Sequence, residues 1–142
     1  MHCLAESNRI IIVGIPGVGK TTVVSRVVEL LKEKNVKVSV SIFGSVMFNE
    51  AKKKGVNNRD DIRKLSVKEQ KELQSMAART IASITDDVVI VDTHAFISTQ
   101  EGFYPGLPHN VLEILNPNSF IMISARPEEI YNRRMTDTSR TR

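Results

Sequence analysis

Near the start of the chain runs the segment Ile10-Ile11-Ile12-Val13-Gly14-Ile15-Pro16-Gly17-Val18-Gly19-Lys20-Thr21. Its first four residues are β-branched, which is typical of a strand buried on both faces of a parallel sheet. Its last eight residues fit the pattern G-x-x-x-x-G-K-[ST]. After them, apolar residues recur at helical spacing from Val23 to Leu31, so a helix is expected next. A buried strand, this loop and a helix form the context that the motif requires.

Residues 14–21 are called the phosphate loop here. The backbone amides of such a loop point inward and bind phosphate groups, and the helix that follows adds the positive end of its dipole. Lys20 would reach the β and γ phosphates, and the Thr21 hydroxyl would bind Mg²⁺. We therefore expect ATP to bind at residues Gly14, Ile15, Pro16, Gly17, Val18, Gly19, Lys20, Thr21 and Thr22.

A second metal ligand is expected at Asp92, which ends the apolar run at residues 88–91. In enzymes with a phosphate loop, an acid at this place holds Mg²⁺. A single Asp after a strand also serves as a helix or turn cap, and this alternative stays open. With the phosphate loop present, we favour the metal role.

The remaining pattern predicts an α/β fold. Apolar and polar residues alternate over residues 36–42, and further strands are expected at 88–91 and 120–123. We predict a three-layer, mainly parallel sheet of four strands with helices on both faces. A parallel sheet that stops there leaves an edge that a further strand normally covers, so we expect a fifth strand to be missing and the chain to be cut short at Arg142.

A chain of 142 residues fits one domain. A helical segment is expected at about 44–85: Gly55 suits a helix end, Asn58 a helix cap, and Ser66 with Glu69 a capping box. An apolar stripe on its long helix predicts core packing of Leu73, Met76, Ala77, Ile81 and Ile84. Residues 99–108 are expected to be irregular, and helices are expected to begin at Pro108 and Pro127.

Composition and charge indicate which partners and which cellular location to expect. The net charge of +4 suits an anionic partner. Aromatic residues are few and are not interleaved with the basic ones, so we expect no nucleic-acid partner. No run approaches the ~20 apolar residues of a membrane span, so we expect no membrane partner. With Cys3 as its single cysteine and no signal-like start, the chain is expected to be cytoplasmic.

Arginines suggest what receives the phosphoryl group. Arg59 and Arg63 lie in the helical segment, and Arg133, Arg134, Arg140 and Arg142 lie in the last ten residues. Arginines on two sides of a phosphate loop suit a kinase in which one set binds the acceptor phosphate and the other neutralises the transferred group. Alternatively, Arg59 and Arg63 are solvated charges paired with Asp60 and Asp61. The guanine-reading motif Asn-Lys-x-Asp of GTPases does not occur.

Several motifs in order resemble those of archaeal-type adenylate kinases. They are the phosphate loop, Phe43-Gly44-Ser45-Val46-Met47, Arg59-Asp60-Asp61-Ile62-Arg63-Lys64, Asp92-Thr93-His94, Tyr104-Pro105-Gly106-Leu107-Pro108, and residues 135–142. The resemblance covers essentially the whole chain. It implies Mg²⁺-dependent transfer from ATP to AMP to give two ADP, a lid beginning at about 134–142, and a homotrimer.

The resemblance also implies residue roles. Lys20, Arg134, Arg140 and Arg142 would act on the transferred phosphate. AMP would bind through Arg63, His94, Tyr104, Gly106 and Leu107. Without the resemblance, His94 reads as a histidine that makes an ordinary hydrogen bond at a strand end.

Two departures and two alternatives remain. Ile62 replaces an expected Met, and Phe103 an expected Tyr. A lid that cannot close cannot exclude water, so an early chain end puts efficient transfer in doubt. The alternatives are a kinase of the same architecture for another nucleoside monophosphate or a small hydroxyl compound, and a nucleotide-binding module that is inactive because it is truncated.

Overall fold

The central sheet is parallel and has the order β2-β3-β1-β6. The structure is a computed structural model that describes residues 6–99 and 102–136. The strands are β1 (Asn8–Val13), β2 (Val38–Ile42), β3 (Val88–Thr93) and β6 (Ser119–Met122). β1 pairs in parallel with both β3 and β6, and β2 pairs in parallel with β3. The predicted four-stranded parallel sheet is confirmed.

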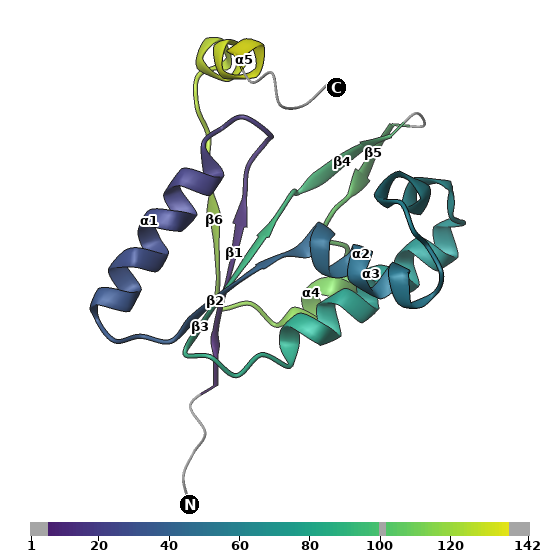
Figure 1. The fold of residues 1–142 in the computed structure, drawn as a ribbon, viewed down its shortest axis with the longest axis horizontal. Coiled ribbons are helices and arrows are strands. Elements are labelled where there is room, and N and C mark those ends of the chain that lie inside the picture. The colour runs from purple at the N-terminus through teal and green to yellow at the C-terminus, as the bar shows by residue number, and fades with distance from the viewer. Residues whose placement is uncertain (1–5, 100–101, 137–142) are drawn as a thin grey trace, which may run out of the picture.

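Helices cover both faces of this sheet (Figure 1). Because side chains alternate along a strand, Ile12 packs with Val24 of α1 (Lys20–Glu33) on one face. Ile11 and Val13 pack on the other face, in a core with α2 (Phe43–Lys53), α3 (Val67–Ala82) and α4 (His109–Leu115). The expected arrangement of three layers is confirmed.

Local sequence signals set the ends of these elements. α1 and α2 both end in a Schellman motif, with a positive φ at Asn35 (58°) and Gly55 (89°). The short 3₁₀ helix η1 (Arg59–Lys64) is capped by the Asn58 side chain, which accepts a hydrogen bond from the amide of Asp60. Ser66 and Glu69 form the predicted capping box at the start of α3. The caps at Gly55, Asn58 and Ser66 were predicted from residue type and spacing.

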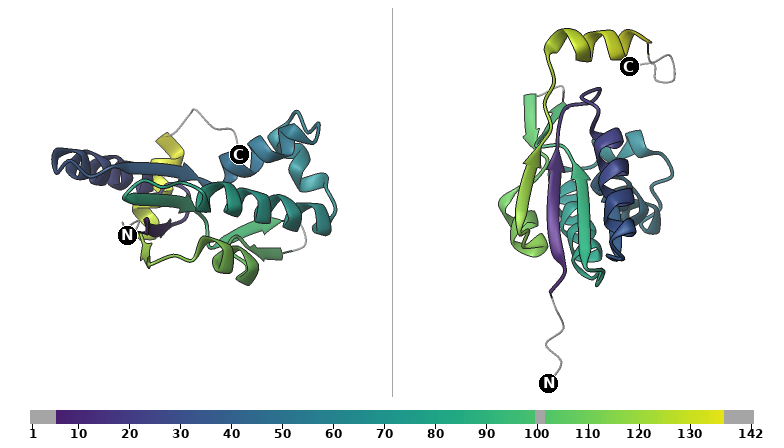
Figure 2. Two further views of the ribbon diagram at one scale, coloured as in Figure 1. Left: turned by 90° about the horizontal axis from the view of Figure 1, so that it is seen from below. Right: turned by 90° about the vertical axis from the view of Figure 1, so that its left-hand side faces the viewer.

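The prediction of an irregular segment at 99–108 is wrong. The chain forms an antiparallel hairpin of β4 (Phe96–Thr99) and β5 (Gly102–Pro105), with Ile97 opposite Tyr104. Figure 2 shows this hairpin beside the main sheet. In the sequence, Gly102 and Pro105 are signs of a loop. They lie at the two ends of β5, where a strand tolerates glycine and proline.

The predicted apolar stripe of α3 is mostly confirmed. Leu73, Ala77 and Ile81 are buried, and Ile84 packs against the main core just after the helix. Met76 is only half-buried and lies outside the core clusters, on a cavity at the outer face of α3. Its predicted role in the core is therefore not confirmed.

The last described helix, α5 (Pro127–Thr136), lies across the end of the sheet where the phosphate loop leaves β1 (Figure 1). Its Ile130 is buried and lies beside Gly17. Within residues 6–99 and 102–136, we find no helix with the length and hydropathy needed to cross a bilayer.

Candidate nucleotide-binding site

The phosphate loop turns at the carboxyl end of β1 and leads directly into α1. Gly17 and Gly19 have φ values of 89° and 95°, which residues with a side chain rarely adopt. Gly19 is the N-cap of α1. The loop therefore places its amides and the helix N-terminus at one point, which is the arrangement that binds phosphate.

Lys20 and Asp92 form an ion pair at this point. Asp92 stands in β3 between Ile12 of β1 and Ile42 of β2, at the middle of the sheet edge. The side chains of Lys20 and Asp92 are only 11% and 14% exposed, and the ammonium also donates to the carbonyl oxygen of Thr93 at 3.2 Å. The sheet thus holds one cation and one carboxylate at the mouth of the phosphate loop.

The oxygen ligands present fit Mg²⁺. Thr21 and Asp92 line the same cleft and offer a hydroxyl and a carboxylate. The described part of the chain contains no cluster of three or more His, Cys, Asp or Glu that could enclose a metal. Mg²⁺ is commonly held by one or two protein oxygens, with water and phosphate oxygens completing its shell, so this small donor set suits it.

Two arginines of α5 donate hydrogen bonds to backbone carbonyls of the phosphate loop. Arg134 donates from Nε and Nη2 to the Pro16 carbonyl oxygen, at 3.0 and 2.7 Å. Arg133 donates from Nη1 to the carbonyl oxygen of Val18 at 2.9 Å. These hydrogen bonds join α5 to the phosphate loop, and both arginines also line the cleft described next. Arg134 was expected near the phosphates, whereas the contact of Arg133 was not anticipated.

A cleft of about 1210 Å³ opens above the sheet edge. One wall is the phosphate loop with Thr22, Asp92 and α5. The opposite wall comes from α2, η1, α3 and the hairpin, through Phe43, Gly44, Ser45, Met47, Arg59, Gln74, Ile97 and Gly106. Pockets for one small ligand typically measure about 300–1,000 Å³, so this cleft has room for more than one nucleotide group.

Arg59 lines this cleft, and Arg63 does not. A Cβ atom added to Gly44 would lie 2.5 Å from Nη2 of Arg59, so the guanidinium lies directly over this glycine. In a 3₁₀ helix residues i and i+3 share a face, so Arg59 aligns with the buried Ile62 and Arg63 points elsewhere. Arg63 is exposed on η1.

Of the other residues expected to bind AMP, two line the cleft and two do not. His94 lines the cleft, and its Nδ1 lies 3.1 Å from the carbonyl oxygen of Gly14. Gly106 also lines it and packs so tightly on the His94 carbonyl that no side chain would fit. Tyr104 on β5 and Leu107 do not line the cleft, and Leu107 packs against the main core. Arg140 and Arg142 lie outside the described residues.

Gln74 was not predicted from the sequence, Arg133 was expected only as one of the C-terminal group of arginines, and the role of Arg59 was left open. The signal for Gln74 was available, because it interrupts an apolar helical stripe. For Arg59, a signal was the adjacent Gly44, whose lack of a side chain leaves room for a guanidinium. Nothing in the sequence indicated that Arg133 binds loop carbonyls, since that contact depends on where α5 lies.

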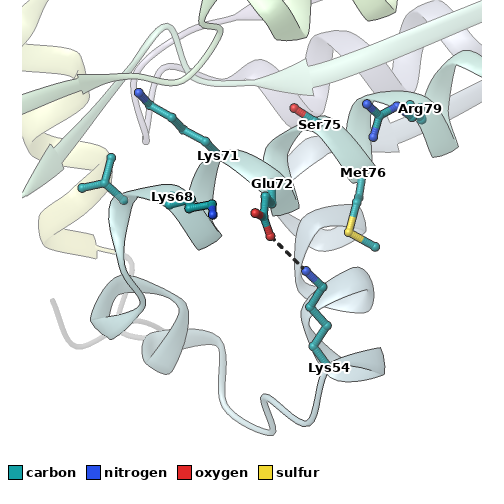
Figure 3. Close-up of a pocket in the computed structure, with 8 residues that line it drawn as sticks. Lys54, Lys68, Lys71, Glu72, Ser75, Met76 and Arg79 are labelled. Atoms are coloured by element: carbon teal, nitrogen blue, oxygen red, sulfur yellow. Dashed lines mark ion pairs between the residues drawn. The ribbon is translucent and has the colours of Figure 1, made fainter.

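A second cavity, of about 740 Å³, lies on the outer face of α3 (Figure 3). Lys54 of the loop after α2 forms an ion pair with Glu72 there, at 3.5 Å. Lys68, Lys71 and Arg79 add further positive charge. None of the phosphate loop, Asp92 or the strand ends contributes to it, so this cavity is separate from the cleft at the phosphate loop.

Known proteins match this chain over most of its length. A family model described as an AAA domain matches residues 13–142. The adenylate kinase of Sulfurisphaera tokodaii is 47% identical over 137 residues, which cover 93% of this chain and 71% of that protein. The adenylate kinase of Methanocaldococcus jannaschii is 44% identical over 139 residues, covering 96% and 72%.

A solved structure described as the crystal structure of APE1195 superimposes with a TM-score of 0.53. It covers 94% of this chain and 69% of that chain at 19% identity, and supports the fold alone. Three observations support the same family: the order of the motifs, the position of the phosphate loop at the carboxyl end of β1, and the sequence identity to these relatives. The chain belongs to the adenylate kinase family.

Proposed function

We propose that this protein catalyses reversible, Mg²⁺-dependent transfer of a phosphoryl group from ATP to AMP, giving two ADP. The observation that carries the proposal is that one cleft is lined both by the phosphate loop and by a wall that carries an arginine. The phosphate loop with Lys20 forms one wall, and Arg59 projects from the other. A donor and an acceptor bound there would meet between the two walls.

On the donor side, the loop amides and Lys20 would hold the ATP phosphates. Lys20 now pairs with Asp92, so phosphate binding would exchange one anionic partner of the ammonium for another. Thr21 and Asp92 would hold Mg²⁺, which supplies charge neutralisation on the phosphate oxygens when bound. Arg134, Arg140 and Arg142 are proposed to complete the positive charge over the transferred group.

On the acceptor side, we assign the phosphate of AMP to Arg59. Arg63 was the first expectation, but its exposed position outside the cleft favours Arg59 for this role. His94 and Gly106 remain candidates because they line the same cleft, and the assignment is weaker for Tyr104 and Leu107. The acceptor is a phosphate already ionised at neutral pH, so no side chain needs to remove a proton, and the protein's task is orientation and charge stabilisation.

The proposal is tested by a screen of acceptors with MgATP, followed by phosphorus NMR. The sample is the protein made from the full reading frame that carries this chain. We expect ADP to appear from AMP, in an amount equal to twice the ATP consumed. Transfer only to a hydroxyl compound, or ATP binding with no transfer to AMP, would reject the proposal in favour of one of the two alternatives above.

The assignment of Arg59 is tested by comparing Arg59→Ala with Arg63→Ala. Both are exposed arginines of η1, so each change has a similar effect on charge and helix propensity. Loss of a charge-assisted hydrogen bond costs about 1.5–3 kcal/mol, so Arg59→Ala should raise the KM for AMP roughly 10-fold to 100-fold and leave the KM for ATP nearly unchanged. A larger effect from Arg63→Ala would return the role to Arg63.

Two further expectations stay predictions. The homotrimer follows only from the family resemblance, and a cytoplasmic location follows only from composition.

A further inference from the structure

Gln74 is a polar residue on an apolar stripe. It precedes Ala77, Ala78 and Ile81 by three, four and seven residues, so all four share one face of α3. Those three residues are fully buried, and helical periodicity calls for an apolar side chain at position 74 as well. Gln74 is half-buried. Burying part of an amide costs free energy unless its polar atoms find partners, so the residue needs a reason to be there.

The amide of Gln74 has no hydrogen-bond partner among residues 6–99 and 102–136. Gln70, one helical turn earlier, is different: its Nε2 donates to the carbonyl oxygen of Leu65 at 2.8 Å. Gln74 instead lines the large cleft, on the wall that carries Arg59. The same helix therefore holds one glutamine with a structural partner and one whose amide group faces the cleft unpaired.

The surroundings of Gln74 suit a flat ring with a polar edge. Met47 of α2 is half-buried and Ile97 of β4 is partly exposed, and both line this wall. Apolar groups with a small number of placed polar groups are the usual lining of a ligand site, the polar ones giving orientation and specificity. Since Arg59 lies on the same wall, one acceptor could place its phosphate on the arginine and its base beside Gln74.

We propose that Gln74 recognises the base of the acceptor nucleotide by hydrogen bonds to its edge. This inference rests on the proposed function, because it takes the acceptor to be a nucleoside monophosphate. A carboxamide carries both donors and an acceptor, and adenine presents an N6 donor beside ring-nitrogen acceptors. Gln74 thus pairs with adenine in a two-bond arrangement and adds base recognition to the phosphate contact of Arg59.

The first test is calorimetric titration of AMP and of ATP into the protein and into Gln74→Leu. The substitution keeps the side chain's approximate volume and suits the apolar stripe, so the melting temperature should hold or rise. AMP should bind about tenfold more weakly, and the affinity for ATP should be unchanged. Gln70→Leu is the matched control: it loses a structural hydrogen bond, so it should lower the melting temperature without changing AMP affinity.

The second test is Gln74→Glu, which should change which base the site prefers, because it changes the hydrogen bonds that residue 74 can form. An ionised carboxylate only accepts hydrogen bonds, whereas adenine needs a donor for its ring nitrogen. Guanine presents the N1 and N2 donors side by side, and these match two carboxylate oxygens. Gln74→Glu should therefore weaken the binding of AMP and strengthen the binding of GMP. The ratio of AMP affinity to GMP affinity should fall at least tenfold.

The outcomes separate this inference from the function on which it rests. If the unmodified protein binds AMP but both Gln74 variants bind AMP and GMP as it does, the role of Gln74 is overturned and the proposed function stands. An equal loss for AMP, GMP and ATP in the variants would also overturn it, since that pattern marks a general structural defect. If the unmodified protein binds no AMP, the proposed function fails and the inference fails with it.

Discussion

Two glycines beside the cleft, Gly44 and Gly106, leave space that neighbouring groups occupy. Arg59 reaches the cleft because Gly44, in the first turn of α2, has no side chain to block it. Gly106 similarly allows the chain after the hairpin to pack on the His94 carbonyl. These glycines shape the acceptor side as much as the residues that would contact the ligand.

Gly44→Ala tests that relation at the residue scale. The added Cβ would lie 2.5 Å from the Arg59 guanidinium, which is the flexible end of a side chain and would move away. AMP affinity should fall several-fold while ATP affinity stays the same. Alanine favours a helix over glycine by up to about 1 kcal/mol, so the melting temperature should hold or rise slightly. Calorimetry and thermal melts measure the two effects.

Gly55→Ala is the contrasting control. Gly55 has a φ of 89° and open space around its missing Cβ, so alanine there is strained without touching anything. It should lower the melting temperature through a cost of about 1–2 kcal/mol and leave AMP affinity alone. If Gly44→Ala gives this same pattern, the steric account of Arg59 is incorrect.

At the scale of elements, α2 and α3 are joined by a buried carboxylate. Glu50 of α2 is 4% exposed and accepts hydrogen bonds from Lys53 Nζ and from Thr80 Oγ1 of α3. The hydrogen bond from Lys53 lowers the pKa of Glu50 below its ordinary value of 4.5, against the opposing effect of burial, and the bond from Thr80 lowers it further. This contact joins two helices within the wall that carries Arg59 and Gln74.

The lowered pKa of Glu50 gives a pH-dependent contribution to stability. A carboxyl group with a depressed pKa in the folded state stabilises the fold above the unfolded pKa, and this contribution is lost as the pH falls through the folded pKa. Glu50→Gln should therefore lower the melting temperature by a few degrees at pH 7, and the difference from the unmodified protein should shrink as the pH falls below about 4.5. Melts between pH 7 and pH 3 measure it.

Glu33→Gln, an exposed glutamate at the end of α1, is the control and should follow the unmodified protein at every pH. A constant difference between Glu50→Gln and the unmodified protein down to pH 3 would rule out the linkage described.

Some helices and strands could be predicted from the sequence, and others could not. Caps at Gly55, Asn58 and Ser66 were predictable because each depends on a few adjacent residues. The hairpin was missed because glycine and proline signal a loop locally, whereas the pairing of β4 with β5 depends on residues of the partner strand. In the site, the phosphate loop and Asp92 followed from a motif and a strand end. Arg59, Arg133 and Gln74 needed the positions of η1, α5 and α3 relative to the cleft.

At the scale of the whole molecule, the cleft joins segments that are far apart in sequence. The parallel sheet brings the carboxyl ends of β1, β2 and β3 to one edge, so the phosphate loop, the start of α2 and Asp92 converge there (Figure 1). Crevices outside the carboxyl ends of parallel strands are the usual ligand sites of such sheets. Here the opposite wall, from α2 to the hairpin, adds the side that we propose binds the acceptor.

We propose that one cleft holds a donor and an acceptor nucleotide and exchanges a phosphoryl group between them. The most direct measurement is to incubate the protein with MgADP alone and follow the phosphorus NMR spectrum. We predict that ADP disproportionates into equal amounts of ATP and AMP, and that Lys20→Ala forms neither because it lacks the ammonium at the mouth of the phosphate loop. Release of free phosphate without ATP, or ADP that remains unchanged at concentrations where both nucleotides bind, would contradict the claim.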